Sequence, residues 1–158
     1  MKIGFTCSTF DLFHAGHIMM LKEAKQQCDY LIVGLQTDPS IDRDWKNKPV
    51  QTLFERYVQL QACRYVDEIV PYSTEGELLD ILVSYPIDVR IIGEEYRNKQ
   101  FTGFDLPITV YFNSRKHSFS TTELRKRVAN SEFLKYQRVT KAATTSELFK
   151  ENAETVSM

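Results

Sequence analysis

The sequence predicts an α/β fold in which a parallel sheet of about five strands carries helices on both faces. Short apolar runs typical of buried strands alternate along the chain with longer segments whose apolar residues recur at helical spacing. The runs with strand character cover residues 3–7, 30–35, 68–70, 89–92 and 108–112. Strands that alternate with helices in this way favour βαβ units wound in a Rossmann-like manner.

Three segments between the predicted strands have the spacing of helices. The first begins after Gly16 and carries Leu21 and Ala24, the second spans 53–65, and the third covers 78–83. In open parallel sheets, ligands bind outside the carboxyl ends of the strands. We therefore expect the functional site where the strands end, after residues 7, 35, 92 and 112.

The composition predicts one globular domain followed by a polar extension. With 158 residues, of which 42% are hydrophobic, the chain is long enough for one buried core and too short for two. We place the domain at 1–128. The segment 129–158 is polar and shows no strand pattern, so we assign it to a helical extension or tail, with a helix over 146–152.

Charge and hydropathy exclude several classes of partner. The formal net charge is −1, so no global field attracts the protein to nucleic acid or to an anionic membrane surface. No apolar run approaches the roughly 18 residues of a membrane span, and the N-terminus lacks the pattern of a secretory signal. The three cysteines form no C-x-x-C pair, which suits reduced thiols. We expect a soluble, cytoplasmic protein.

The segment from Thr6 to His17 carries the strongest functional pattern. It joins the first predicted strand to the first helix, where small residues let the backbone approach a phosphate and a helix N-terminus favours anions. His14 and His17 lie three residues apart at the helix start, so both imidazoles can face one ligand. Taken alone, this spacing also suits two surface histidines or a pair of zinc ligands, although zinc needs further ligands.

A second polar segment precedes the extension. Ser120-Thr121-Thr122-Glu123 has the form of a capping box, and a helix N-terminus with two hydroxyls binds anions as readily as it caps itself. Glu123 is the only acid between Arg115 and Val128, where several basic side chains occur. In a nearly neutral protein, this local excess of positive charge suits a triphosphate.

The two segments together resemble a known family. Ser8-Thr9-Phe10-Asp11-x-x-His14-x-Gly16-His17 resembles the H-x-G-H signature of the nucleotidyltransferase superfamily. Arg115-x-x-x-x-Ser120-Thr121-Thr122 resembles the second signature of its cytidylyltransferase family. The similarity covers about 1–128 and is strongest to the bacterial glycerol-3-phosphate cytidylyltransferases.

The resemblance implies roles for individual residues. His14 and His17 would act on the triphosphate, and Arg115 and a lysine of the loop after the second strand would add positive charge. That lysine is Lys46 or Lys48, of which we favour Lys46. The remaining residues implied in nucleotide binding are Thr9, Phe10, Asp11, Gly16, Glu94, Ser120, Thr121 and Thr122.

The acceptor would be held by a separate pair of cations. Arg56 and Arg64 lie eight residues apart on the second predicted helix, so both point near one face. They resemble two family arginines that hold the acceptor's phosphate, with Lys48 as a further candidate. Ordinary surface charge on a helix explains the two arginines equally well.

The implied reaction is transfer of CMP from CTP to a phosphorylated small alcohol, with glycerol 3-phosphate as the first candidate. Mg²⁺ would bind mainly through the nucleotide phosphates, because no carboxylate cluster indicates a metal site built from protein side chains. The family resemblance also implies a homodimer. The alternatives are an adenylyltransferase, a cytidylyltransferase with phosphoethanolamine or a sugar phosphate as acceptor, and a nucleotide-binding module without turnover.

Overall fold

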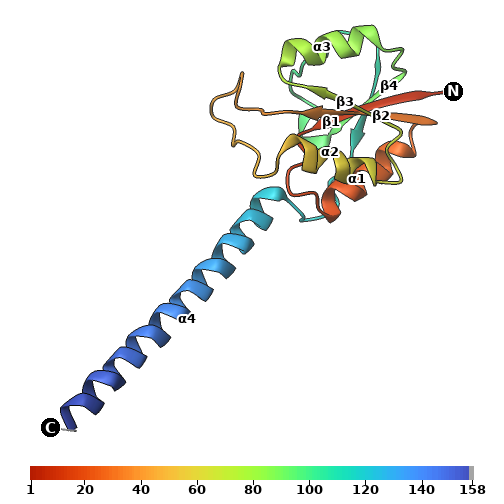
Figure 1. Cartoon of the computed structure of the whole chain (residues 1–158). Coiled ribbons are helices and arrows are strands. Elements are labelled where there is room, and N and C mark those ends of the chain that lie inside the picture. The colour runs from red at the N-terminus through yellow and green to blue at the C-terminus, as the bar shows by residue number, and fades with distance from the viewer. Residues whose placement is uncertain (157–158) are drawn as a thin grey trace. The chain divides into compact units, whose positions relative to one another are not determined.

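A five-stranded parallel sheet forms the centre of the computed structural model, which describes residues 1–156 (Figure 1). Every paired strand runs parallel to its neighbour, and the order across the sheet is β3-β2-β1-β4-β5. The strands are β1 (Ile3–Ser8), β2 (Tyr30–Gln36), β3 (Glu68–Tyr72), β4 (Val89–Gly93) and β5 (Thr109–Asn113). The predicted α/β fold class is confirmed, and each predicted strand is present.

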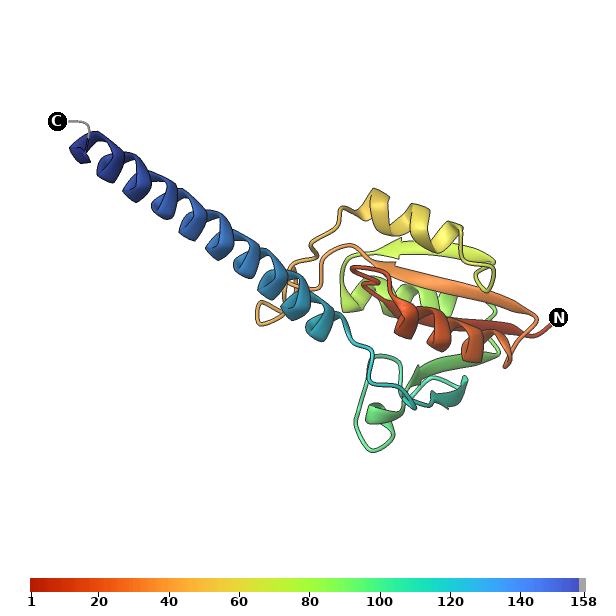
Figure 2. The same cartoon turned by 90° about the horizontal axis from the view of Figure 1, so that it is seen from below.

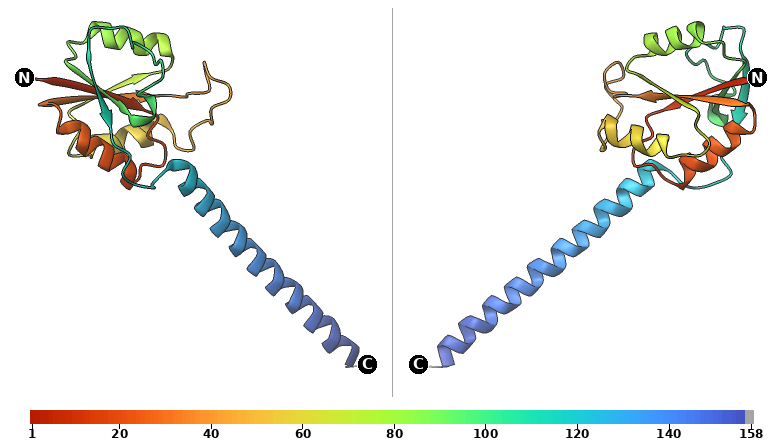
Figure 3. Two further views of the ribbon diagram at one scale, coloured as in Figure 1. Left: turned by 180° about the vertical axis from the view of Figure 1, so that it is seen from behind. Right: turned by 45° about the vertical axis from the view of Figure 1, so that its right-hand side comes forward.

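Helices cover both faces of the sheet, as Figures 1 and 3 show. Helices α1 (Ala15–Lys25) and α2 (Leu53–Gln61) contribute Leu21 and Leu60 to one buried apolar cluster. Helix α3 (Glu75–Ser84) contributes Leu78 and Leu82 to a second cluster on the other face. Burial of these two clusters fixes which strand residues point to which side, since side chains alternate along a strand.

The chain changes direction across the sheet after β3. From β1 it moves outward through β2 and β3, and it then crosses back to β4 and β5 on the other side of β1. The carboxyl ends of β1 and β4 therefore border a topological switch point, where ligands bind in sheets of this type. Figure 2 shows the connections after β1 (red) and β2 (orange) leaving the sheet at the edge away from the N-terminus.

Helix α2 is shorter than its sequence pattern predicts. It begins at Leu53 after a capping box in which Thr52 and Glu55 exchange hydrogen bonds, and it ends at Gln61. The segment that follows turns, with the Cys63 N–H donating to Leu60 O and the Val66 N–H donating to Cys63 O. The prediction of a helix through 53–65 is therefore wrong at its C-terminal end, because the chain must turn there to reach β3.

Helix α4 (Thr121–Val156) is one uninterrupted helix of 36 residues. The chain divides into two compact units at Thr121/Thr122, so the predicted domain boundary after residue 128 falls inside this helix. No glycine or proline occurs between 121 and 156, and nothing in the sequence stops the helix once it has started. The predicted helix over 146–152 forms part of it, and residues 157–158 of the predicted extension lie outside the described residues.

No helix within residues 1–156 combines the length and the apolar character that crossing a bilayer requires.

Candidate active site

A cleft of about 860 Å³ opens at the carboxyl ends of β1 and β4, which is where the switch point predicts a ligand site. We call it the switch-point cleft. Many of the predicted site residues line it, although they come from separate parts of the sequence. These are Thr9, His14, Gly16, His17, Lys46, Arg115, Ser120 and Thr121.

Unsatisfied polar atoms concentrate in the switch-point cleft. Among the described residues, five buried side-chain nitrogen or oxygen atoms lack a hydrogen-bond partner, and four of them belong to residues that line the cleft. Those four atoms are Gln36 Nε2, Arg43 Nε, Asn113 Oδ1 and His117 Nδ1. Because buried polar groups in proteins are nearly always paired, this concentration indicates a site built for a polar ligand.

His14 and His17 cap helix α1 with their own side chains. His14 is the N-cap residue, and its Nδ1 accepts a hydrogen bond from Gly16 N at 3.0 Å. His17 Nδ1 accepts from His14 N at 3.2 Å, which completes a reciprocal capping box. The two rings stack with centroids 3.8 Å apart. The sequence therefore uses two histidines where serine and glutamate usually stand.

The capping box also fixes the tautomer of both histidines. An imidazole nitrogen that accepts a hydrogen bond carries no hydrogen, so the single proton of each neutral ring lies on Nε2. Both side chains line the cleft. The fold thus presents two Nε2–H donors from one turn of helix.

Burial keeps the His17 ring neutral. Burial first, and then the neighbouring His14 ring, lower the pKa of His17 to about 3, against an opposing effect of Asp11. Burial, followed by His117, lowers the pKa of His14 as well. Near pH 7 both residues therefore act as neutral hydrogen-bond donors, and they do not act as cations.

Thr121 holds the His14 donor in place. The Thr121 hydroxyl donates to the backbone oxygen of Asp11 at 3.4 Å, and its lone pairs face His14 Nε2 at 3.1 Å. With the proton of His14 on Nε2, the ring donates to Thr121 Oγ1. This bond joins the two predicted signatures, which lie more than a hundred residues apart in sequence.

The turn after β1 is held in an unusual backbone conformation. Phe10 and Leu12 both have positive φ, at 51° and 50°, a backbone conformation that residues other than glycine rarely adopt. Phe10 is buried, and its ring meets the edge of the His17 ring with centroids 5.4 Å apart. Phe10 therefore packs against the His17 ring within the core, and it does not line the cleft.

Asp11 anchors this turn to the segment before α2. Its two carboxylate oxygens accept hydrogen bonds from Val50 N and Gln51 N, both at 2.9 Å. In return, the Gln51 side chain accepts from Leu12 N at 2.8 Å. Asp11 is buried and does not line the cleft, so the structure gives it a role in shaping the turn.

Arg56 does not have the position predicted for an acceptor-binding residue. Its side chain is only 2% exposed, and its guanidinium donates to four backbone carbonyl oxygens. They belong to Thr9, Gln36, Thr37 and Gln51. Arg56 therefore ties the turn after β1 to the end of β2, and the prediction that it holds the acceptor's phosphate is corrected to a structural role.

Arg64 also lies away from the cleft. It follows the end of α2, so it does not share a helix face with Arg56 as predicted. Its exposed guanidinium lies over the Tyr65 ring at 5.9 Å from the centroid. The structure thus places neither of the two predicted acceptor-binding arginines in the switch-point cleft.

The two lysines of the loop after β2 differ in position. Both are exposed, but Lys46 lines the switch-point cleft and Lys48 does not. Among the described residues, no carboxylate lies within ion-pair distance of Lys46. Its position therefore agrees with the preference for Lys46 over Lys48.

Glu95, and not the predicted Glu94, faces the cleft. Both belong to a short 3₁₀ helix, η1 (Glu94–Tyr96), that follows β4. Glu94 points to Arg97, with two contacts of 2.9 and 3.1 Å, whereas Glu95 lines the cleft and pairs with Arg115 at 2.6 Å. A Cβ on Gly93 would meet the Glu95 carboxylate, so a side chain at this position would displace that carboxylate.

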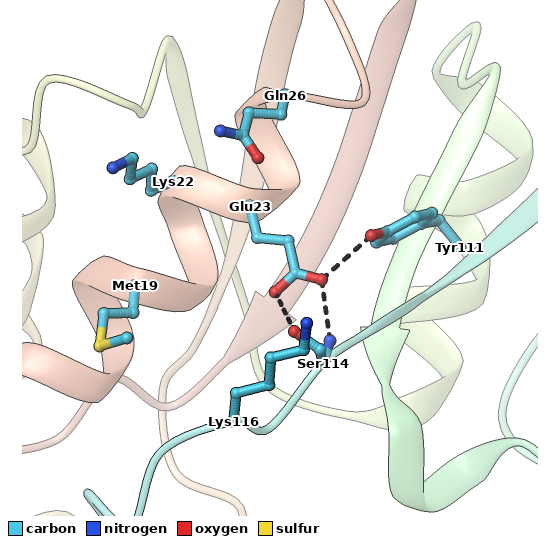
Figure 4. Close-up of a pocket in the computed structure, with 7 residues that line it drawn as sticks. All are labelled: Met19, Lys22, Glu23, Gln26, Tyr111, Ser114 and Lys116. Atoms are coloured by element: carbon cyan, nitrogen blue, oxygen red, sulfur yellow. Dashed lines mark hydrogen bonds between the residues drawn. The ribbon is translucent and has the colours of Figure 1, made fainter.

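The segment that carries Arg115 is anchored to α1 through Glu23. One Glu23 oxygen accepts from the Tyr111 hydroxyl and from Ser114 N, and the other accepts from Ser114 Oγ (Figure 4). The three bonds are 2.9 to 3.0 Å long. These residues border a smaller pocket of about 340 Å³, which shares Ser114 with the switch-point cleft. Glu23 positions the backbone next to Arg115.

The charges that line the switch-point cleft are predominantly positive. Glu75 pairs with Arg43 at 3.3 Å and Glu95 pairs with Arg115, so both lining acids are neutralised. Lys46 and Arg90 line the cleft as well, which leaves a net charge of +2 with the histidines neutral. This field suits an anion such as a nucleotide triphosphate.

Glu75 and Arg90, which the sequence did not predict as site residues, also line the cleft, as does Arg43 of the basic loop that carries Lys46. Arg90 had a visible signal, because it interrupts the apolar run Val89-Arg90-Ile91-Ile92. A charged residue within a buried strand needs a special reason. Thr122, by contrast, belongs to the second compact unit, and its assignment to nucleotide binding stays a prediction.

No group of three or more histidine, cysteine, aspartate or glutamate side chains that could hold a metal ion occurs among residues 1–153, whose side chains the structure describes. The two histidines of α1 therefore have no zinc-binding partners in that part of the chain.

Comparison with known proteins identifies relatives over most of the chain. Residues 5–127 match the Cytidylyltransferase-like family. The chain is 33% identical over 129 residues to the glycerol-3-phosphate cytidylyltransferase of Bacillus subtilis (strain 168), which covers 82% of this chain and 98% of that protein. It is 26% identical over 162 residues to the ethanolamine-phosphate cytidylyltransferase of Arabidopsis thaliana, covering 96% of this chain but only 38% of that longer protein.

The fold recurs in a solved structure. The lipopolysaccharide core biosynthesis protein of Thermoplasma volcanium GSS1 superposes with a TM-score of 0.62 at 21% identity, over 74% of this chain and 99% of the other. At that identity the likeness concerns the fold alone. The family match, however, spans most of the chain and contains both histidines of the α1 capping box. The chain therefore belongs to the cytidylyltransferase-like family.

Proposed function

We propose that the protein transfers CMP from CTP to a phosphorylated small alcohol and releases pyrophosphate, with glycerol 3-phosphate as the first acceptor to test. The observation that carries this proposal is the pair of neutral Nε2–H donors of His14 and His17 in a cleft of net positive charge. Such donors stabilise negative charge that develops during transfer. The choice of acceptor is supported by the sequence similarity to the glycerol-3-phosphate cytidylyltransferase of Bacillus subtilis, which extends over nearly the whole length of that protein.

In the proposed reaction, an oxygen of the acceptor's phosphate attacks the α-phosphorus of CTP. The new P–O bond forms as the bond from the α-phosphorus to the bridging oxygen breaks, and pyrophosphate leaves with that electron pair. The attacking phosphate is already ionised near neutral pH, so no side chain has to remove a proton. The protein's task is therefore to orient the reactants and to stabilise charge.

The residues of the switch-point cleft divide this task. His14 and His17 would donate to the α-phosphate and the bridging oxygen, and His14 would exchange its bond to Thr121 Oγ1 for the bond to the nucleotide. Lys46 and Arg115 would add positive charge. Ser120 and Thr121 line the same cleft, and their hydroxyls would bind the outer phosphates. Thr121 would exchange its long bond to the Asp11 carbonyl oxygen for one to a phosphate oxygen. Glu95 orients Arg115 through its ion pair.

Mg²⁺ would enter with the triphosphate. The described side chains, those of residues 1–153, offer no cluster of three or more metal-binding groups, so the ligands would be mainly phosphate oxygens and water. When bound, the ion would share the neutralisation of the pyrophosphate that leaves.

A pyrophosphate-release assay tests the proposal. We expect pyrophosphate only when CTP, Mg²⁺ and a phosphorylated acceptor are all present, and at least tenfold less with ATP in place of CTP. Thermal-shift measurements with each nucleotide and Mg²⁺ report binding separately. Binding of CTP without pyrophosphate formation, over a panel of glycerol 3-phosphate, phosphoethanolamine and sugar phosphates, would contradict the proposal and indicate a nucleotide-binding module.

A homodimer, which the family resemblance implies, is a separate proposal that sedimentation velocity can test directly.

A further inference from the structure

One end of the switch-point cleft contains a cluster that the proposed reaction does not use. It consists of Gln36 at the end of β2, Arg43 in the loop that follows, Glu75 at the start of α3 and Arg90 in β4. We call these four residues the tail subsite. Arg90 points to the α3 face of the sheet, because its neighbours Val89 and Ile91 belong to the cluster on the other face. The histidines, in contrast, lie at the start of α1.

Hydrogen bonds join the members of the tail subsite. The Arg43 Nη2 group donates to Gln36 Oε1 at 3.0 Å and pairs with Glu75 Oε1 at 3.3 Å. The other Glu75 oxygen accepts from the Thr102 hydroxyl at 2.6 Å, and the Thr102 backbone oxygen accepts from Arg90 Nη1. The side chains are thus held in one connected arrangement.

The tail subsite carries one positive charge in excess. Both oxygens of Glu75 are occupied, one of them by Arg43, so its charge is already neutralised. Arg90 is only 5% exposed, and no carboxylate of the described residues lies within 4 Å of its guanidinium. The guanidinium also contacts the Cys7 side chain and lies over the Phe101 ring, 5.1 Å from its centroid. A buried arginine without an acid is costly, and it indicates a ligand with oxygen atoms.

Two further donors in the cluster lack partners. Gln36 Nε2 and Arg43 Nε are buried without a hydrogen bond, and both belong to residues that line the cleft. Every unsatisfied atom of the tail subsite is therefore an N–H donor. The group that satisfies them must supply acceptor oxygens, which hydroxyl groups do and an ammonium group cannot.

The proposed function assigns the histidine end of the cleft to the reacting phosphates, and the present inference rests on that assignment. An acceptor whose phosphate lies beside the α-phosphate of CTP has only its alcohol portion left for the rest of the cleft. We infer that the tail subsite binds the hydroxyl oxygens of a polyol or sugar phosphate and excludes acceptors with a cationic tail. Arg90 is the specificity-determining residue, since an ammonium group there would face a guanidinium whose charge no carboxylate neutralises.

The test compares glycerol 3-phosphate, a sugar phosphate and phosphoethanolamine on the full chain. Isothermal titration in the presence of Mg²⁺ and the non-reactive α,β-methylene analogue of CTP gives the Kd of each acceptor. Pyrophosphate release with CTP gives kcat and KM. We expect at least one hydroxylated acceptor to bind tenfold or more tightly than phosphoethanolamine.

Single substitutions test whether the selectivity among acceptors depends on the tail subsite. Arg90→Gln should raise the Kd and KM of the hydroxylated acceptor at least tenfold and leave the KM of CTP within threefold, whereas Arg138→Gln, which removes an exposed arginine of α4, should change neither. If Arg90→Gln does not fold, Glu75→Gln serves instead. In Glu75→Gln, phosphoethanolamine should still bind with a higher Kd than the hydroxylated acceptor, because Glu75 does not bind an ammonium group of the acceptor.

The outcomes distinguish this inference from the proposed function. Selective binding of a hydroxylated acceptor without pyrophosphate formation would overturn the proposed function and support the subsite. Turnover in which phosphoethanolamine serves equally well or better would overturn the subsite and leave the proposed function standing. Failure of all three acceptors to bind, or an equal effect of Arg90→Gln on CTP and on every acceptor, would also overturn the subsite.

Discussion

Substitution of His17 by asparagine separates its two tasks. In the protein, His17 Nδ1 accepts from His14 N and so caps α1, while Nε2–H is the donor assigned to the phosphates. Asparagine is shorter, so its Oδ1 can still accept from the His14 N–H, but it has no donor at the position of Nε2. Glutamine reaches further and can place an N–H near that position.

The two tasks have different magnitudes. Loss of a helix cap costs about 1 kcal/mol of unfolding free energy, whereas loss of one charge-stabilising donor costs roughly 100- to 1000-fold in kcat, equivalent to about 3–4 kcal/mol. We expect His17→Asn to fold with nearly the wild-type free energy of unfolding and to lose at least 100-fold in kcat. His17→Gln should recover part of that loss.

The assay is steady-state pyrophosphate release with CTP and the best acceptor, accompanied by urea unfolding of each variant. The matched control is Asn47→Ala, which changes an exposed loop residue that does not line the cleft. If His17→Asn keeps kcat within a few-fold of wild type while remaining folded, His17 serves only as a cap and the assigned mechanism is refuted.

Three further predictions follow from the described contacts. Arg56→Met should lower the free energy of unfolding by about 3 kcal/mol or more, since four buried carbonyls lose their donor; a normal urea midpoint with a raised acceptor KM would restore the acceptor-binding role. The pKa of His17 lies near 3 in the folded protein and near 6.5 when unfolded, so the unfolded chain takes up the proton first as the pH falls and stability is lost below pH 6.5. Between pH 7 and 5, wild type should therefore lose about 2 kcal/mol more than His17→Asn, and parallel pH profiles of the two would contradict the buried neutral ring. Glu23→Met should lower kcat roughly tenfold because methionine cannot accept from Ser114 N, Ser114 Oγ or the Tyr111 hydroxyl, and an unchanged kcat would show that the Arg115 segment needs no anchor.

Local sequence patterns predicted most of the fold and the centre of the site. The alternation of apolar runs with helical segments depends on burial of two sheet faces, and each predicted strand is present. The two histidines and Thr121 could be brought together in advance because the carboxyl end of β1 and the segment after β5 must reach the same edge of a parallel sheet. The family match over residues 5–127 spans both segments.

The residues that were misplaced depend on contacts distant in sequence. The burial of Arg56 follows from carbonyls at the ends of β1 and β2, which no local pattern displays. The choice between Glu94 and Glu95 depends on how a single 3₁₀ turn is oriented after β4. Helix α4 was underestimated because its polar residues resemble those of a tail, although nothing in them interrupts a helix.

Membership of the family does not identify the acceptor. Family membership fixes the type of transfer that the cleft is suited to, whereas the acceptor depends on side chains at the far end, including Arg90, that the family signatures do not contain. Specificity in such a site follows from which groups of the ligand are left unpaired. Relatives that act on different phosphorylated alcohols are consistent with that division.

The central claim, that the acceptor's phosphate attacks the α-phosphorus of CTP in the switch-point cleft, is tested most directly by isotope transfer. Glycerol 3-phosphate labelled with ¹⁸O in its phosphate is incubated with CTP, Mg²⁺ and the full chain, and the products are followed by ³¹P NMR. We predict equimolar CDP-glycerol and pyrophosphate, with all the label in CDP-glycerol, including its bridging oxygen. Label in pyrophosphate, or release of CMP without CDP-glycerol, would contradict this account.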